Sequence, residues 1–270
     1  MTFKIGFAAE EMSGAAVAEP VVPCEVREPR RSVVQVKFPD RGGTLAYYND
    51  QFDLRCGDLV WVSGKLEGQL GRVVGVSYTF KIKLSDYQRV IAVADTEVRG
   101  RFFHAGSHFV TFDPAALPCE QVLSWFCAPD KEDDVIVSGS DGETFSISDL
   151  KGMDVTPAIA QRGHGYYLEN RVRYISINGT KGFALVEGTE PYTVEFQYRN
   201  GEISALTCSC YCAYPCKHQF AAMLQLKEML ALVEKQYAAE FERTACFAAV
   251  EKSTFFTFAV DGKENGSFTL

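Results

Sequence analysis

The chain has 270 residues and a formal net charge of -8; 47% of its residues are apolar and 23% are charged. A chain of this length and composition can bury one large or two modest hydrophobic cores, and no run approaches the roughly 20 apolar residues of a membrane-spanning helix. The acidic balance excludes a protein that coats a polyanion with its whole surface.

The N-terminal segment, residues 1–20, is dominated by small and acidic residues. Such a composition buries too little apolar surface to order the backbone, so we expect a flexible arm. Glu10 and Glu11 interrupt its short apolar stretch, which argues against a secretory signal. The chain also has nine cysteines, four of them within residues 208–216, a clustering typical of metal ligands in a reducing compartment. We therefore expect a cytoplasmic protein.

Five runs of β-branched and aromatic residues follow the arm, separated by Gly, Asp and Asn. Short strands at this spacing predict a small β-barrel domain over residues 21–98. The runs cover residues 33–38, 44–48, 58–63, 69–78 and 89–95.

Residues 99–150 are harder to interpret, and we expect a connecting subdomain with a short helix at 117–126 and a hairpin around Asp141-Gly142. His104 and His108 in this stretch have the i, i+4 spacing of metal ligands on a helix. Their surroundings are β-like and include a glycine, so their rings are not expected to converge.

A second group of strands is predicted after a helical turn at 154–161, with an Asn200-Gly201 turn before the last of them. An amphipathic helix from Lys217 to about Glu242 and a C-terminal hairpin over 245–270 complete the expected α+β fold. The four strands are expected at residues 171–177, 181–188, 191–198 and 202–208.

Four metal-ligand side chains stand at the junction between the last of these strands and the long helix. Cys208 and Cys210 lie two residues apart at the strand end, and Cys216 and His218 lie two apart where the helix begins. Three thiolates and one imidazole suit a closed, tetrahedral structural zinc site. The helix N-terminus and Lys217 favour the thiolate form that binds metal. The sequence therefore predicts one zinc ion, which pins the strand to the helix.

This arrangement resembles the SWIM-type zinc finger: C-x-C, a loop, then C-x-H with a lysine inside the last pair and an Ala-rich helix after it. The resemblance covers residues 160–232 and predicts a SWIM-type domain over 151–244. Preceding residues also match the family, namely Gly165-Tyr166-Tyr167, Arg171-Val172, Val186-Glu187-Gly188 and Tyr192-x-Val194. The five-residue loop is short for the family and contains an extra thiol, Cys212, which could replace Cys208 or Cys210 as a ligand.

The resemblance implies recognition rather than catalysis, because SWIM fingers are associated with DNA binding and protein contacts. We therefore expect a non-enzymatic adaptor that contacts DNA or a DNA-processing partner, such as a helicase-like ATPase or a recombination factor. Residues 160–227 carry seven basic against five acidic residues, a weak positive field within an acidic chain. The alternative is a thiol-based redox enzyme or sensor that uses the cysteine cluster for disulfide exchange. Aromatic and basic side chains that could contact nucleic acid or a partner are Arg162, Arg171, Arg173, Tyr211, Tyr214 and Lys217.

Overall fold

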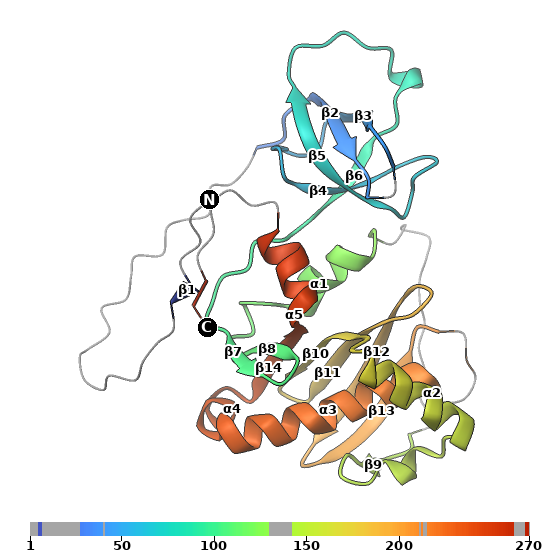
Figure 1. The fold of residues 1–270 in the computed structure, drawn as a ribbon, viewed down its shortest axis with the longest axis vertical. Coiled ribbons are helices and arrows are strands. Elements are labelled where there is room, and N and C mark those ends of the chain that lie inside the picture. The colour runs from blue at the N-terminus through green and yellow to red at the C-terminus, as the bar shows by residue number, and fades with distance from the viewer. Residues whose placement is uncertain are drawn as a thin grey trace, which may run out of the picture.

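Two antiparallel sheets lie one above the other along the long axis of the molecule (Figure 1). The computed structural model describes residues 5–6, 28–39, 41–129, 142–210, 212, 215–261 and 268–269. Among these residues, no helix combines the length and the apolar character needed to cross a membrane. The fold is thus a mixture of helices and antiparallel sheets, as expected.

The N-terminal sheet is built from the five runs predicted as strands, in the order β3-β2-β5-β4-β6. Alternate valines of these strands fill its interior, as the β pattern requires. The expected barrel does not close within the described residues, because the edge strands β3 and β6 meet through one isolated bridge, Tyr48 to Arg89. One bridge cannot form a ladder, so the sheet stays open. Its strands are β2 (Ser32–Lys37), β3 (Thr44–Asn49), β4 (Leu59–Val62), β5 (Leu70–Ser77) and β6 (Val90–Ala94), with a 3-10 turn η1 (Leu84–Asp86) before β6.

The second sheet has eight strands in the order β7-β8-β14-β10-β11-β12-β13-β9, and every neighbouring pair is antiparallel. The four strands predicted after residue 170 are β10 to β13, which follow one another in the sheet in chain order. The bounds are β7 (Phe103–Ala105), β8 (His108–Thr111), β9 (Phe145–Ser146), β10 (Val172–Asn178), β11 (Lys181–Glu187), β12 (Pro191–Arg199), β13 (Glu202–Cys208) and β14 (Cys246–Glu251).

This sheet contains strands from three segments that were predicted as separate units, residues 99–150, 151–244 and 245–270. Strands β7, β8 and β9 come from residues 99–150, and β14 comes from the C-terminal segment and inserts between β8 and β10. The predicted boundaries after 150 and 244 therefore fall inside one sheet. Pairing between strands so distant in sequence leaves no local pattern, which is why the division missed it.

The C-terminal segment differs from the expected hairpin. After β14 the chain forms α5 (Lys252–Phe255) and a π-helical turn η3 (Phe256–Val260), where a strand was predicted. Glu251 is the cause, because its carboxylate accepts hydrogen bonds from the backbone N–H groups of Ser253 and Thr254 and so caps a helix. Near the termini, β1 (Ile5–Gly6) pairs in parallel with β15 (Phe268–Thr269). The rest of the expected arm, and residues 130–141 of the hairpin predicted around Asp141-Gly142, lie outside the described residues.

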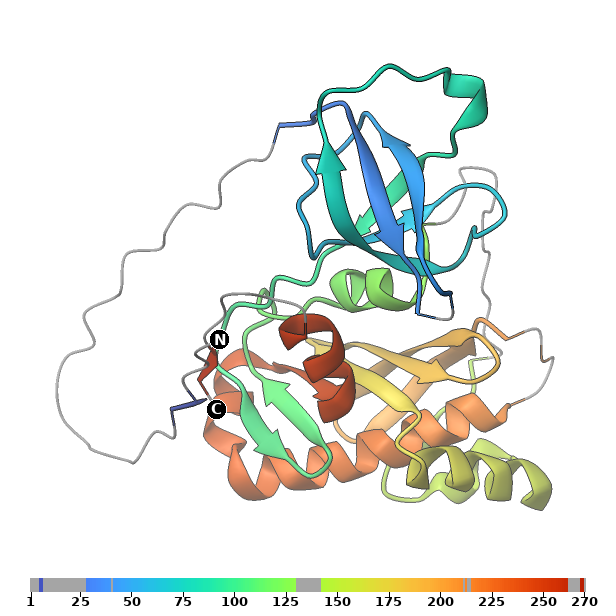
Figure 2. The ribbon, with the colours of Figure 1, turned by 45° about the horizontal axis from the view of Figure 1, so that its top comes forward.

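Helices cover both faces of the large sheet. The long helix α3 (Lys217–Gln236) crosses one face, with α2 (Pro157–Leu168) packed beside it (Figure 1). The predicted long helix is interrupted at Tyr237, after which α4 (Ala238–Thr244) begins. On the other face, α1 (Cys119–Phe126) and α5 lie between the two sheets (Figure 2). A 3-10 turn, η2 (Leu150–Met153), precedes α2.

Candidate metal centre

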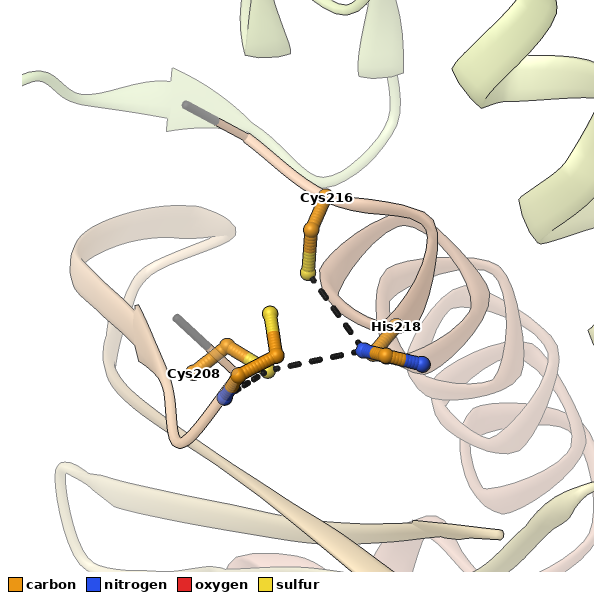
Figure 3. A group of neighbouring side chains, drawn as sticks. Cys208, Cys216 and His218 are labelled. Carbon is orange, nitrogen blue, oxygen red and sulfur yellow. Dashed lines mark hydrogen bonds between the residues drawn. The ribbon is translucent and has the colours of Figure 1, made fainter. Parts of the chain in front are cut away.

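Three cysteine sulfurs and an imidazole meet between the end of β13 and the start of α3 (Figure 3). One ligand atom from each of Cys208, Cys210, Cys216 and His218 lies within 4.8 Å of the others. The Nδ1 atom of His218 is 3.8 Å from the sulfur of Cys208 and 3.8 Å from that of Cys216. Around tetrahedral zinc, with Zn–S near 2.3 Å and Zn–N near 2.0–2.1 Å, sulfur and nitrogen ligands stand about 3.6 Å apart. The four side chains can therefore hold one metal ion.

A β-bulge in β13 turns Cys208 toward α3. Val194 of β12 pairs with Cys208, and Gln197 pairs with Ser204, so the register shifts between these pairs and one extra residue is accommodated in β13. Ala205 lies in this region with a φ of 49°. Ile203 and Cys208 both pack against the core on the α3 side, although residues five apart on a regular strand point to opposite faces. The bulge thus places the first ligand on the metal side.

The N-terminus of α3 positions the second pair of ligands. Cys216 is the N-cap residue, and its sulfur accepts a hydrogen bond from the backbone N–H of Gln219. The side-chain oxygen of Gln219 in turn accepts from the N–H of Cys216 at 2.7 Å, which completes a capping box. The amide nitrogen of Gln219 also donates to the carbonyl of Leu206 in β13 at 3.3 Å. Gln219 therefore ties the helix start to the strand that carries Cys208.

The thiols of the cluster differ in acidity because they donate to one another. Hydrogen bonding from the Cys208 thiol, with further donation from His218 and the Gln219 N–H, lowers the pKa of Cys216 below its ordinary value in spite of burial. The pKa of Cys208 is raised, chiefly because its thiol donates to Cys216 and because it is buried. Burial also raises the pKa of Cys210. The coupled pair of Cys208 and Cys216 therefore favours one thiolate shared between the two sulfurs.

The imidazole of His218 is held between aromatic rings. Tyr192 stacks on it with ring centroids 4.0 Å apart and an interplanar angle of 16°, and Tyr166 lies 5.5 Å away. His218 is only 4% exposed. Its Nε2 atom is buried without a hydrogen-bond partner among the described residues, while Nδ1 faces the sulfurs. This orientation makes Nδ1 the ring nitrogen that is available to a metal ion.

Gly188 leaves room for this stack, which leads to a first prediction. A methyl group at residue 188 would stand 2.8 Å from Cε2 of Tyr192 and 3.4 Å from Nε2 of His218. Gly188→Ala should therefore displace the rings and weaken metal binding about 10- to 100-fold, as expected for a change beside a ligand. Competition with a chromophoric zinc chelator measures this. Gly165→Ala is the matched control, since nothing lies within 4 Å of its added methyl group; equal affinities in the two variants would contradict the positioning role.

The candidate contact residues do not all lie near the cluster. Lys217 and Arg171 both stand over the ring of Tyr166, at 4.6 Å and 4.9 Å from its centroid. Arg162 is exposed on α2. Arg173 instead pairs with Glu187 and Glu251 and lines a cavity between the sheets, apart from this surface. Tyr211 and Tyr214 lie outside the described residues.

Cys212, His104 and His108 do not belong to the four-ligand group. Cys212 is exposed. His104 and His108 lie on the two strands of the β7–β8 hairpin, not on a helix. His108 is fully buried, with Nε2 3.0 Å from the carbonyl oxygen of Val172 and Nδ1 3.0 Å from the hydroxyl of Ser107. It is a hydrogen-bonded core residue, and the described residues contain no metal-ligand group around it.

Two residues that shape the centre were not identified as such from the sequence. Gln219 occupies the fourth position of a capping box, a pattern that was hidden because cysteine replaces the usual serine or threonine. Tyr192 was noted only as part of a strand motif, and its stack on His218 depends on a contact between distant segments.

Comparison of the chain with protein-family models, curated proteins and solved structures finds no match.

Proposed function

We propose that the protein is a zinc-stabilised, non-enzymatic recognition module of the SWIM type, which contacts DNA or a DNA-processing protein. One observation carries the proposal: three sulfurs and the Nδ1 atom of His218 converge within 4.8 Å where a strand meets a helix N-terminus. Three thiolates with one histidine form a closed, four-ligand set, which is typical of structural zinc rather than of catalytic zinc with an open position.

The surface beside the metal supports a recognition role. Lys217 follows a ligand directly, and it and Arg171 flank the Tyr166 ring that packs against the ligand His218. Cations beside an aromatic ring can hold phosphate and stack on bases. Glu169, however, pairs with Arg171 at 2.6 Å and reduces its field. The surface is therefore only moderately basic, which suits an acidic protein partner as well as DNA.

Fluorescence anisotropy with labelled single- and double-stranded DNA tests the nucleic-acid version. We expect binding at 50 mM salt that weakens steeply by 200 mM, because each phosphate contact releases counterions. The triple variant Arg162→Gln, Arg171→Gln, Lys217→Gln should weaken binding by at least tenfold. The control carries the same three charge losses at Lys65, Lys81 and Lys83, which are exposed in the N-terminal part of the chain.

The outcomes separate the two partners. Equal losses in both triple variants would show that the metal-side surface is not the DNA-binding one. An absence of DNA binding at low salt would leave a protein as the partner. In that case a DNA-processing enzyme should co-purify with the native chain but not with the variant that carries Arg162→Gln, Arg171→Gln and Lys217→Gln. Failure of both results would overturn the recognition proposal.

A further inference from the structure

A cavity of about 700 Å³ lies between the two sheets, away from the metal centre. Strands β4 and β5 of the N-terminal sheet form one side of it, and Arg173 and Glu187 of the large sheet form the other. Helices α1 and α5 lie between the sheets at this level (Figure 2). Small-molecule sites have volumes of about 300–1,000 Å³ and occur preferentially between domains, so both size and position suit a ligand.

The wall of the cavity combines apolar rings with cations. Trp61, Trp125 and Phe258 line it, but the two tryptophans are only 3% and 1% exposed. The half-buried ring of Phe258 stacks on that of Trp125 at 5.2 Å and 20° and carries the accessible aromatic face. Both tryptophan side chains are anchored by their indole N–H groups, which donate to the carbonyls of Ser124 and Asp95. A rigid aromatic wall of this kind favours a planar or apolar ligand body.

The charges on the wall indicate the sign of the ligand. Lys37 of β2 and Arg72 of β5 are direct cross-strand partners, and both line the cavity. Like charges at directly opposed positions destabilise a sheet, because their side chains share one face. The carboxylate of Asp261 is 3.8 Å from Arg72 and is 77% exposed, so this ion pair compensates little of the repulsion. Arg72 also donates to the carbonyl oxygens of Gly57 and Asp261. Glu187 also lines the cavity and pairs with Arg173 at 2.6 Å, while Arg173 pairs with Glu251 as well at 3.2 Å. The anionic group is therefore expected on the side of Lys37 and Arg72, away from these two carboxylates.

We propose that this cavity binds a small organic anion, whose aromatic or apolar body lies against Phe258 and whose anionic group lies between Lys37 and Arg72. The anion would relieve the repulsion between the two opposed cations. It would also join the N-terminal sheet to η3, because the groups that contact it come from both. This site is independent of the metal centre and of the proposed recognition role.

The site can be tested with 1-anilinonaphthalene-8-sulfonate, a fluorescent aromatic anion, on the intact chain. The chain has only two tryptophans, and both line the cavity, so excitation of tryptophan should transfer energy to the bound probe. We expect saturable binding of one probe per chain. The anion 2-naphthoate should displace it at concentrations at least tenfold lower than its neutral counterpart 2-naphthamide.

Single charge removals then locate the anionic group. Lys37→Gln and Arg72→Gln should each weaken probe binding by about tenfold, as expected for the loss of one charge-assisted hydrogen bond. Lys65→Gln, an exposed control in the same part of the chain, should bind normally. Circular dichroism checks that each variant is folded. Lys37 is exposed, so Lys37→Gln should stay folded and tests the site even if Arg72→Gln unfolds. Non-saturable binding, equal displacement by both competitors, or unchanged affinity in Lys37→Gln would overturn the proposal.

Discussion

The purified chain is expected to contain one zinc ion, and Cys216→Ser is expected to lose it and to unfold at a markedly lower temperature. Cys216 combines a ligand sulfur with the N-cap of α3, so its loss affects both the metal and the helix start. With free zinc 1,000-fold above its dissociation constant, binding stabilises the folded state by about 4 kcal/mol. For a chain of this size that corresponds to a fall in melting temperature of roughly 8–16 °C. Metal analysis and thermal unfolding measure the two effects.

Cys212→Ser is the control for this experiment. Cys212 is exposed and outside the four-ligand group, so the variant should keep its zinc and its melting temperature. Chelation of the wild-type protein should reproduce the effect of Cys216→Ser and make the thiols reactive. A metal-free wild-type chain whose thiols react quickly without chelation would instead favour the redox alternative. Loss of zinc from Cys212→Ser would make that residue a ligand.

Replacement of Glu251 is expected to cost about 1–3 kcal/mol of stability, because it leaves buried hydrogen-bond donors without an acceptor. Its side chain is 8% exposed and accepts hydrogen bonds from the backbone of Ser253 and Thr254 as well as from their hydroxyls. It also pairs with Arg173 at 3.2 Å. Glu251→Ala would leave the donors of Ser253 and Thr254 without their acceptor, and α5 would lose its cap. Arg173 would keep its pair with Glu187. Urea unfolding measures the loss.

The same carboxylate predicts a pH dependence. Burial acts to raise the pKa of Glu251, but hydrogen bonds from Ser253 and Thr254 outweigh it and lower the pKa below the ordinary value of 4.5. A lowered pKa in the folded state means that the contribution of Glu251 is complete above the ordinary value and is lost as the pH falls through the folded-state value. The stability difference between wild type and Glu251→Ala should therefore shrink in acid.

Glu195→Gln, which replaces an exposed carboxylate of β12, is the control and should change stability by less than about 0.5 kcal/mol. A loss of stability in Glu195→Gln as large as that in Glu251→Ala would contradict the role assigned to Glu251.

The strands and the metal-ligand group were within reach of the sequence because their signals are local. Runs of β-branched and aromatic residues mark β2 to β6 and β10 to β13, and the four ligands span only residues 208–218. The end of a strand and the start of the helix that follows it after a short loop must lie close together in space, so these four side chains meet without a contact between distant segments. The ligand types then suffice to indicate a metal.

The arrangement of the sheets was decided only by tertiary structure. β14 pairs with β8 and β10, which lie far from it in sequence, and no local pattern specifies such partners. The same pairing brings Glu251 to Arg173 and draws that arginine into the cavity, whereas Arg171, two residues earlier, stays beside Tyr166.

At the candidate metal centre, some features follow from the sequence alone and others from the tertiary structure. The amino-acid sequence by itself determined which side chains could hold a metal ion, because their chemistry and spacing are encoded within eleven residues. The face toward which Cys208 points was set by the bulge in β13, which depends on the register against β12. Register follows from burial over the whole sheet, and a one-residue shift reverses every side chain beyond it. Strand alternation alone would therefore place this ligand on the wrong side of the sheet.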